Sequence, residues 1–155
     1  MPNHFHFIVE VKDRGTVFPR IKKRNQTDSG TDKDELCARY TSRQFNNLLV
    51  AYAKAINKQE NRDGSLFKKN FKHKVIEDEK YLKECIMYVH LNPVHHNFTR
   101  YPSEWKYSSY NILLGNNSTR LDRQGVMELF GDKENFIYVH QHKRDFVYIK
   151  KLEDE

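Results

Sequence analysis

The alternation of apolar and polar positions predicts extended structure near the start of the chain. The segment "HFHFIVEVK" (residues 4–12) is rich in aromatic and β-branched side chains, which are enriched in strands. Successive side chains of a strand point to opposite faces, so His4 and His6 would share one face. The stretch "LFKKNFKHKVI" predicts a further strand over residues 70–76. The stretch "DFVYIKKL", at residues 145–152, is typical of a final strand or a tail.

Helical periodicity characterises the middle of the chain. Apolar side chains between residues 45 and 56 recur three and four positions apart, which predicts an amphipathic helix. Thr41 or Ser42 would cap this helix after a polar loop at residues 24–35. The Asp-Gly dipeptide at residues 63–64 would form the turn that follows it.

The rest of the chain also has helical patterns. A second helix is predicted to begin at a cap, Asp78, and to run to about Leu91. It should stop there because the residue before Pro93 avoids helical geometry. Three further short helices are predicted, within residues 101–115, 121–131 and 132–142.

Composition narrows the class of protein. The 155 residues suggest one domain, and 37% hydrophobic against 31% charged residues allow a modest core. The apolar runs are far too short for a membrane span, and no signal-peptide pattern opens the chain. Cys37 and Cys85 are too few for a disulfide framework, so we interpret them as reduced thiols of a cytoplasmic protein.

Positive charge is concentrated in two stretches of the chain. The net charge is +6, and residues 12–24 and 66–76 are strongly basic. The second stretch interleaves lysines with phenylalanines, which suits a nucleic-acid backbone and its bases. A solvated basic face is the alternative that charge by itself leaves open. The candidate DNA-binding residues are Phe67, Lys68, Lys69, Phe71, Lys72 and Lys74.

The histidines of the first strand and the helix after Asp78 carry the candidate chemistry. Two imidazoles on one face of a strand can hold one metal ion, so His4 and His6 are candidate ligands. Tyr88 and Asn92 lie four residues apart and would share one face of the helix. A tyrosine facing such a metal ion makes a phosphoryl-transfer site, in which the phenolate attacks phosphorus. An ordinary core position is the alternative for Tyr88.

The other histidines receive structural interpretations. His90 is two residues from Tyr88, so it faces elsewhere and is expected to pack. His140 has no ligand spacing with any other residue that can be placed. His73 lies in the basic stretch, where a surface position or a contact with a DNA backbone is expected.

Two motifs carry a resemblance to a known family. The opening "PNHFHFIVEV" resembles the "PNHxHxxV" signature of HUH single-tyrosine transposases, which include the REP-associated tyrosine transposases. The later "YVHLNPV" resembles the tyrosine helix of that family. The segments "GSLFKKNFKHKVIEDEKYL", "EWKYSSYNIL" and "FGDKENFIYVH" are also similar, so the resemblance extends over essentially the whole chain.

The resemblance implies an enzyme of DNA transposition. Its activity would be metal-dependent nicking and strand transfer of single-stranded DNA through a covalent 5′-phosphotyrosine. By position, His4, His6 and Asn92 would bind Mg²⁺ or Mn²⁺, and Tyr88 would be the nucleophile. The implied partners are single-stranded or hairpin DNA and a second copy of the chain, with no membrane. A catalytically inactive, hairpin-binding remnant of a transposase is the alternative function.

The implied fold is α+β, a ferredoxin-like antiparallel sheet with helices packed on one face and extra C-terminal helices. The family usually places a strand, a helix and a strand before the first motif, so the resemblance implies an N-terminal truncation: a fragment, an internal start or a decayed gene. The open sheet edge would pair with a second copy or with the chain's own end. We expect a single domain over residues 1–155, with a catalytic core at 1–94 and a C-terminal helical extension at 95–155.

Overall fold

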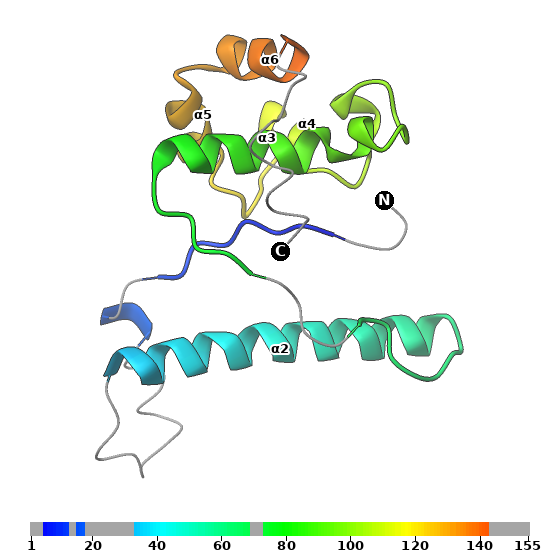
Figure 1. The fold of residues 1–155 in the computed structure, drawn as a ribbon. Helices are drawn as coiled ribbons and strands as arrows, with labels where there is room; N and C mark the ends of the chain where they lie inside the picture. Colours follow the sequence, from blue (N-terminus) through cyan, green and yellow to red (C-terminus); the bar gives the residue numbers. More distant parts are fainter. Residues whose placement is uncertain (1–4, 13–14, 18–32, 69–72, 143–155) are drawn as a thin grey trace. The chain divides into compact units, whose positions relative to one another are not determined.

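The computed structural model describes residues 5–12, 15–17, 33–68 and 73–142 (Figure 1). The chain divides into two compact units. One unit spans residues 9–73, and the other combines residues 1–8 with residues 74–155. The expectation of one domain, with a division after residue 94, stays a prediction.

The predicted ferredoxin-like antiparallel sheet is wrong. In the ranges just given, every regular element is a helix and no strand is present. Residues 5–12 and 73–77, which the sequence predicts as strands at least in part, belong to no helix or strand in the structure. A β-strand requires ladder hydrogen bonds to a second extended segment, which local preference cannot supply. The possible final strand at residues 145–152 lies outside the described residues.

The unit of residues 9–73 contains one long helix, α2 (Lys33–Gln59). The predicted caps, Thr41 and Ser42, are wrong, because α2 begins well before both of them. The residues in between include good helix formers, and the last three residues of the predicted polar loop, 33–35, already belong to the helix. After α2 the chain turns through Gly64, which has φ +94°, and the side-chain amide of Asn57 donates to the Gly64 carbonyl at 2.8 Å.

The central helix of the other unit is α3 (Glu79–His95). The predicted cap is confirmed, since the Asp78 carboxylate accepts a hydrogen bond from the Tyr81 backbone N–H at 2.7 Å. The predicted stop near Leu91 is wrong, because α3 continues through Pro93. A proline ring fixes φ close to the helical value, so near the end of a helix its main effect is the loss of one backbone donor.

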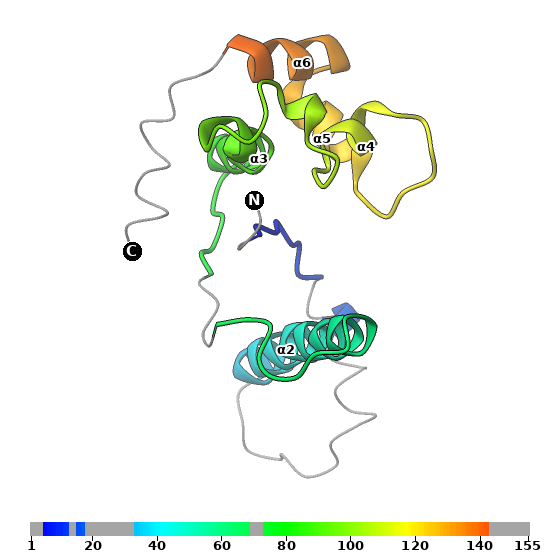
Figure 2. The same cartoon turned by 90° about the vertical axis from the view of Figure 1, so that its right-hand side faces the viewer.

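Four short elements follow α3 in the same unit (Figures 1 and 2). They are η1 (Pro102–Glu104), α4 (Tyr110–Leu114), α5 (Arg123–Phe130) and α6 (Lys133–His142). The two helices predicted within residues 121–131 and 132–142 are therefore confirmed, and residues 101–115 form two short turns of helix instead of one helix. These elements pack on α3 around a core of mostly apolar side chains. The core residues are Ile86, Met87, Leu91, Tyr110, Leu113, Phe130 and Phe136.

Across the described ranges, no helix combines the length and the apolar character that a membrane span requires.

Candidate active site

Helix α3 presents two chemically different faces. Its apolar face, with Ile86 and Leu91, lies in the core against the C-terminal helices. The face that carries Tyr81, Tyr88 and Asn92 follows the seven- and four-residue spacing of a helical stripe. The candidate chemistry therefore lies on the side of α3 that does not build this core.

Tyr88 is the buried centre of that stripe. Its side chain is 7% exposed, and its ring centroid lies 5.0 Å from that of His6. The two rings meet edge to face, at an interplanar angle of 73°. His6 comes from the extended residues 5–8, which belong to the same unit as α3. The structure thus brings together two of the residues that the sequence singled out.

Asn92 lies one helical turn after Tyr88 and is 2% exposed. Within the described part of the chain, neither its carboxamide oxygen nor its nitrogen has a hydrogen-bond partner. Leaving a buried polar group unsatisfied costs about 1–3 kcal/mol, and such a group calls for an explanation, such as an ion or a ligand. A carboxamide oxygen and an imidazole together suit Mn²⁺, and the oxygen suits Mg²⁺. The residues present therefore fit the metal ion that the resemblance implies.

The third predicted ligand, His4, lies outside the described residues. Among the residues that the structure does describe, no three histidine, cysteine, aspartate or glutamate side chains gather into a group that could hold a metal ion. The predicted set of His4, His6 and Asn92 consists of one placed imidazole, one placed amide and one residue without a described position. The ligand roles stay predictions.

The predicted DNA-binding residues are divided between the two units. Phe67 and Lys68 belong to the unit of residues 9–73, where the Phe67 ring stacks on Tyr52 at 6.1 Å. Lys74 is exposed and belongs to the unit of α3. The remaining predicted residues, Lys69, Phe71 and Lys72, lie outside the described residues.

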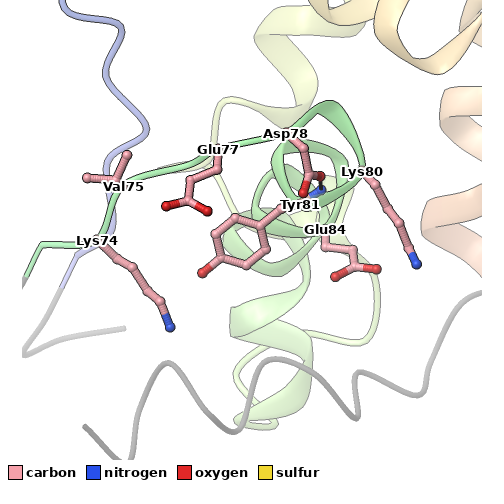
Figure 3. A pocket seen from close by; sticks show the side chains of 7 residues that line it. All are labelled: Lys74, Val75, Glu77, Asp78, Lys80, Tyr81 and Glu84. Atoms are coloured by element: carbon pink, nitrogen blue, oxygen red, sulfur yellow. Dashed lines mark hydrogen bonds between the residues drawn. The ribbon is translucent and has the colours of Figure 1, made fainter.

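A pocket of about 420 Å³ lies at the start of α3 (Figure 3). It is lined by Lys74, Val75, Glu77, Asp78, Lys80, Tyr81 and Glu84. The carboxylate of Asp78 already caps the helix, so this side chain has a structural role. Tyr81, two turns before Tyr88, is the tyrosine of this pocket (Figure 3). It is the second tyrosine on this face of α3 and therefore the residue with which Tyr88, the candidate nucleophile, is best compared.

Cys85 lies between these two tyrosines along α3 and is buried. Burial raises the pKa of its thiol, outweighing a hydrogen bond with Tyr81 that acts in the opposite direction. The thiol is therefore protonated at neutral pH. Because the thiolate is the reactive form, Cys85 is a poor nucleophile.

A chain of buried hydrogen bonds fixes α3 to the C-terminal helices. His90 Nδ1 lies 2.9 Å from His140 Nε2, and His90 Nε2 lies 2.8 Å from Ser109 Oγ. His140 Nδ1 lies 2.7 Å from the Phe136 carbonyl. That carbonyl can only accept, so His140 Nδ1 carries a hydrogen and Nε2 accepts from His90. Ser109 then donates to His90, and every bond in the chain has one direction.

Both histidines of this chain are neutral at physiological pH. Burial, reinforced by the neighbouring His140, lowers the pKa of His90 to about 3. Burial lowers the pKa of His140 to about 4, although its bond to the Phe136 carbonyl acts in the opposite direction. The expectation that His90 packs is confirmed, but sequence reasoning missed His140 as its partner. The available signal was helical spacing, since His90 and His140 each follow an apolar core residue, Ile86 or Phe136, by four positions.

The side chains gathered around α3 form a candidate site of one chemical class. A tyrosine packed against an imidazole, with a buried amide one turn away, is a candidate phosphoryl-transfer site. A curated relative in Haemophilus influenzae bears the name "Putative REP-associated tyrosine transposase". It is 23% identical to this chain over 112 residues, which are 71% of this chain and 54% of the relative.

This similarity is distant and partial. The chain spans about half the length of that curated relative. No family model and no solved structure matches the chain. The similarity suggests a transposase-related function and is consistent with enzymatic activity.

Proposed function

We propose that this chain nicks single-stranded DNA and transfers the cut strand through a covalent bond to Tyr88. One observation carries the proposal: on one face of α3, the buried Tyr88 ring packs against His6 one turn before an amide, Asn92, that lacks a partner in the described residues. The relative's printed name, a tyrosine transposase, agrees with a tyrosine as the reacting group.

The reaction would be a displacement at phosphorus. The Tyr88 oxygen forms a bond to the scissile phosphorus, and the bond from phosphorus to the 3′ oxygen breaks. The phenolic proton is lost and the departing 3′ oxygen gains a proton, so a 5′-phosphotyrosine and a free 3′ hydroxyl result. Attack by a 3′ hydroxyl on the phosphotyrosine would reverse these bonds and join a new strand.

Each residue of the site would have a defined task in this reaction. His6 and Asn92, with His4, would hold Mg²⁺ or Mn²⁺. When bound, such an ion neutralises charge on the non-bridging phosphate oxygens. The edge-to-face contact with His6 would hold the Tyr88 ring in one orientation, which limits the positions of its nucleophilic oxygen.

The proposed substrate is single-stranded DNA beside a hairpin. Phe67, Lys68 and Lys74 are the proposed contacts with its bases and phosphates. A second copy of the chain is a further proposed partner, which rests on the family resemblance. An open sheet edge does not support this partner, because the described residues contain no sheet.

The direct experiment is a search for a covalent adduct. The full chain would be incubated with labelled hairpin oligonucleotides carrying single-stranded flanks and with Mn²⁺, and the products separated under denaturing conditions. Wild type should give a denaturation-resistant adduct, and Tyr88→Phe should give none. Tyr81→Phe is the matched control from the same face of α3 and should keep the adduct.

Two results would contradict the proposal. An adduct that survives in Tyr88→Phe and disappears in Tyr81→Phe would move the nucleophile to the pocket at the start of α3. Hairpin binding by the wild type without any adduct would favour the inactive, DNA-binding remnant.

A further inference from the structure

An aromatic and basic strip follows directly after α3. We use this name for His96, Phe98, Arg100, Trp105, Lys106 and Tyr107. Its rings form a continuous series, with centroids 6.5 Å apart from His96 to Phe98, 6.0 Å from Phe98 to Trp105 and 5.6 Å from Trp105 to Tyr107. The segment lies beyond the C-terminal end of α3, in the yellow-green part of the chain (Figure 1).

The rings of the strip are largely outside the core. Phe98 is 47% exposed and Tyr107 is 74% exposed, while Trp105 between them is half-buried. Single exposed rings are common on protein surfaces, whereas contiguous exposed apolar patches are characteristic of interaction sites. Packing against the described residues therefore leaves the outer faces of Phe98 and Tyr107 exposed.

Cations accompany these rings. The Lys106 ammonium lies 4.7 Å from the centre of the Tyr107 ring, and the Arg100 guanidinium lies 6.0 Å from the Tyr101 ring. The one carboxylate of this segment, on Glu104, accepts hydrogen bonds from the backbone N–H groups of Arg100 and Tyr101 at 2.7 and 3.1 Å. Glu104 thus shapes the backbone, and the two cations remain at the surface.

We propose that this strip binds single-stranded nucleic acid, with bases stacked on Phe98 and Tyr107 and phosphates held by Arg100 and Lys106. Every base offers a flat face to an aromatic ring, and lysine and arginine neutralise phosphates, so alternating rings and cations match a single strand. The inference rests on the proposed function and adds a second DNA contact to it, separate from the basic stretch around Lys74.

The position of the strip supports this occupant over others. The His96 backbone N–H donates to the Asn92 carbonyl at 3.1 Å, so the strip begins one turn after the buried amide of the candidate active site. A strand that lies along the strip therefore leads directly to the end of α3 that carries Asn92. A lipid surface would also attract rings and cations, but it would have no reason to adjoin a phosphoryl-transfer site.

The test measures binding without cleavage. The full chain is titrated into fluorescein-labelled oligothymidine in the presence of a chelator, and fluorescence anisotropy is recorded. Tyr107→Ala and Phe98→Ala should each weaken binding about five- to a hundredfold, the range expected for the loss of one base stack. Lys106→Gln should lower the slope of log affinity against log salt by about 0.7, the value for one phosphate contact on a single strand.

Tyr138→Ala is the matched control, because Tyr138 on α6 is also an exposed ring, 58% exposed, that lies outside the strip. It should bind like the wild type, and far-ultraviolet circular dichroism should show equal helix content in all variants. Three results would overturn the inference: no binding of the oligonucleotide by the wild type, equal binding by strip variants and wild type, or an equal loss in Tyr138→Ala. The same variants can be tested with anionic lipid vesicles. If they weaken binding to the vesicles and leave binding to the oligonucleotide unchanged, the inference is overturned as well.

The adduct experiment separates the two proposals. Strip variants that bind normally, while Tyr88 still forms its adduct, would overturn the strip and keep the proposed function. Strip variants that lose binding, in a chain that never forms an adduct, would keep the strip and overturn the proposed function.

Discussion

The buried histidine chain makes the stability of this protein depend on pH. His90 and His140 are 1% and 2% exposed, and folding lowers the pKa values of both imidazoles, to about 3 and about 4. In the unfolded chain, histidine has a pKa of about 6.5. Between these values the unfolded state binds more protons than the folded state, so the free energy of unfolding rises with pH. The contribution is complete above about pH 6.5 and is lost as the pH falls from there toward the folded values.

The size of the effect follows from the same shifts. A pH of about 5 lies above both folded pKa values but about 1.5 units below the unfolded pKa of histidine. At this pH each histidine is protonated in the unfolded chain and neutral in the folded chain. At 1.36 kcal/mol per unit, this amounts to about 2 kcal/mol for each histidine and about 4 kcal/mol for both. Small domains are stable by only about 5–15 kcal/mol, so acidification should remove a large part of the total.

The perturbation is His140→Gln, studied by urea unfolding at about pH 7.5 and pH 5 with a chelator present. The glutamine does not titrate, so the difference in unfolding free energy between the two pH values should be about 2 kcal/mol smaller in the variant than in the wild type. At the higher pH the variant should be less stable than the wild type, because it disturbs a buried hydrogen bond. His142→Gln is the control from the same helix, because His142 is exposed and bonds only to the Tyr138 carbonyl among the described residues. It should keep the wild-type difference.

Two outcomes would refute this reasoning. Equal unfolding free energies for the wild type at the two pH values would mean that the imidazoles are not buried in their neutral form. A full wild-type difference in His140→Gln would assign the pH dependence to other groups.

The other predictions concern the site, the DNA contacts and the fold. Calorimetry with Mn²⁺ should show heat for the wild type and none for His6→Ala, and equal heats would reject the ligand role. Asn92→Leu should also bind no Mn²⁺. Its free energy of unfolding should nevertheless be about 1–3 kcal/mol higher, because the change removes a buried amide that lacks a partner in the described residues. The double variant with glutamine at Lys68 and Lys74 should lower the salt slope of hairpin binding by about 1.4, and an unchanged slope would place the DNA elsewhere. Asp78→Ala should cost about 1 kcal/mol in urea unfolding, and no loss would show that this cap is dispensable.

The sequence by itself determined the local features of this protein. The Asp78 cap and the two helices that became α5 and α6 follow from capping chemistry and apolar spacing, which act over one or two turns. The same spacing puts Tyr88 and Asn92 on one face of α3, because residues four apart always neighbour each other on a helix. Local rules failed at the ends of elements, where α2 began early and α3 continued through Pro93.

Only the tertiary structure decided which distant segments meet. Strand-forming side chains in residues 5–12 predict extended backbone, but a strand also needs a ladder with a second segment, and no strand is present among the described residues. Two contacts join parts of the chain that no short-range pattern relates: His6 with Tyr88, and His90 with His140. The burial of the Asn92 amide likewise follows from no short-range pattern. The physical reason is that burial and hydrogen-bond partners belong to the packed core as a whole, whereas spacing and capping belong to a few consecutive residues.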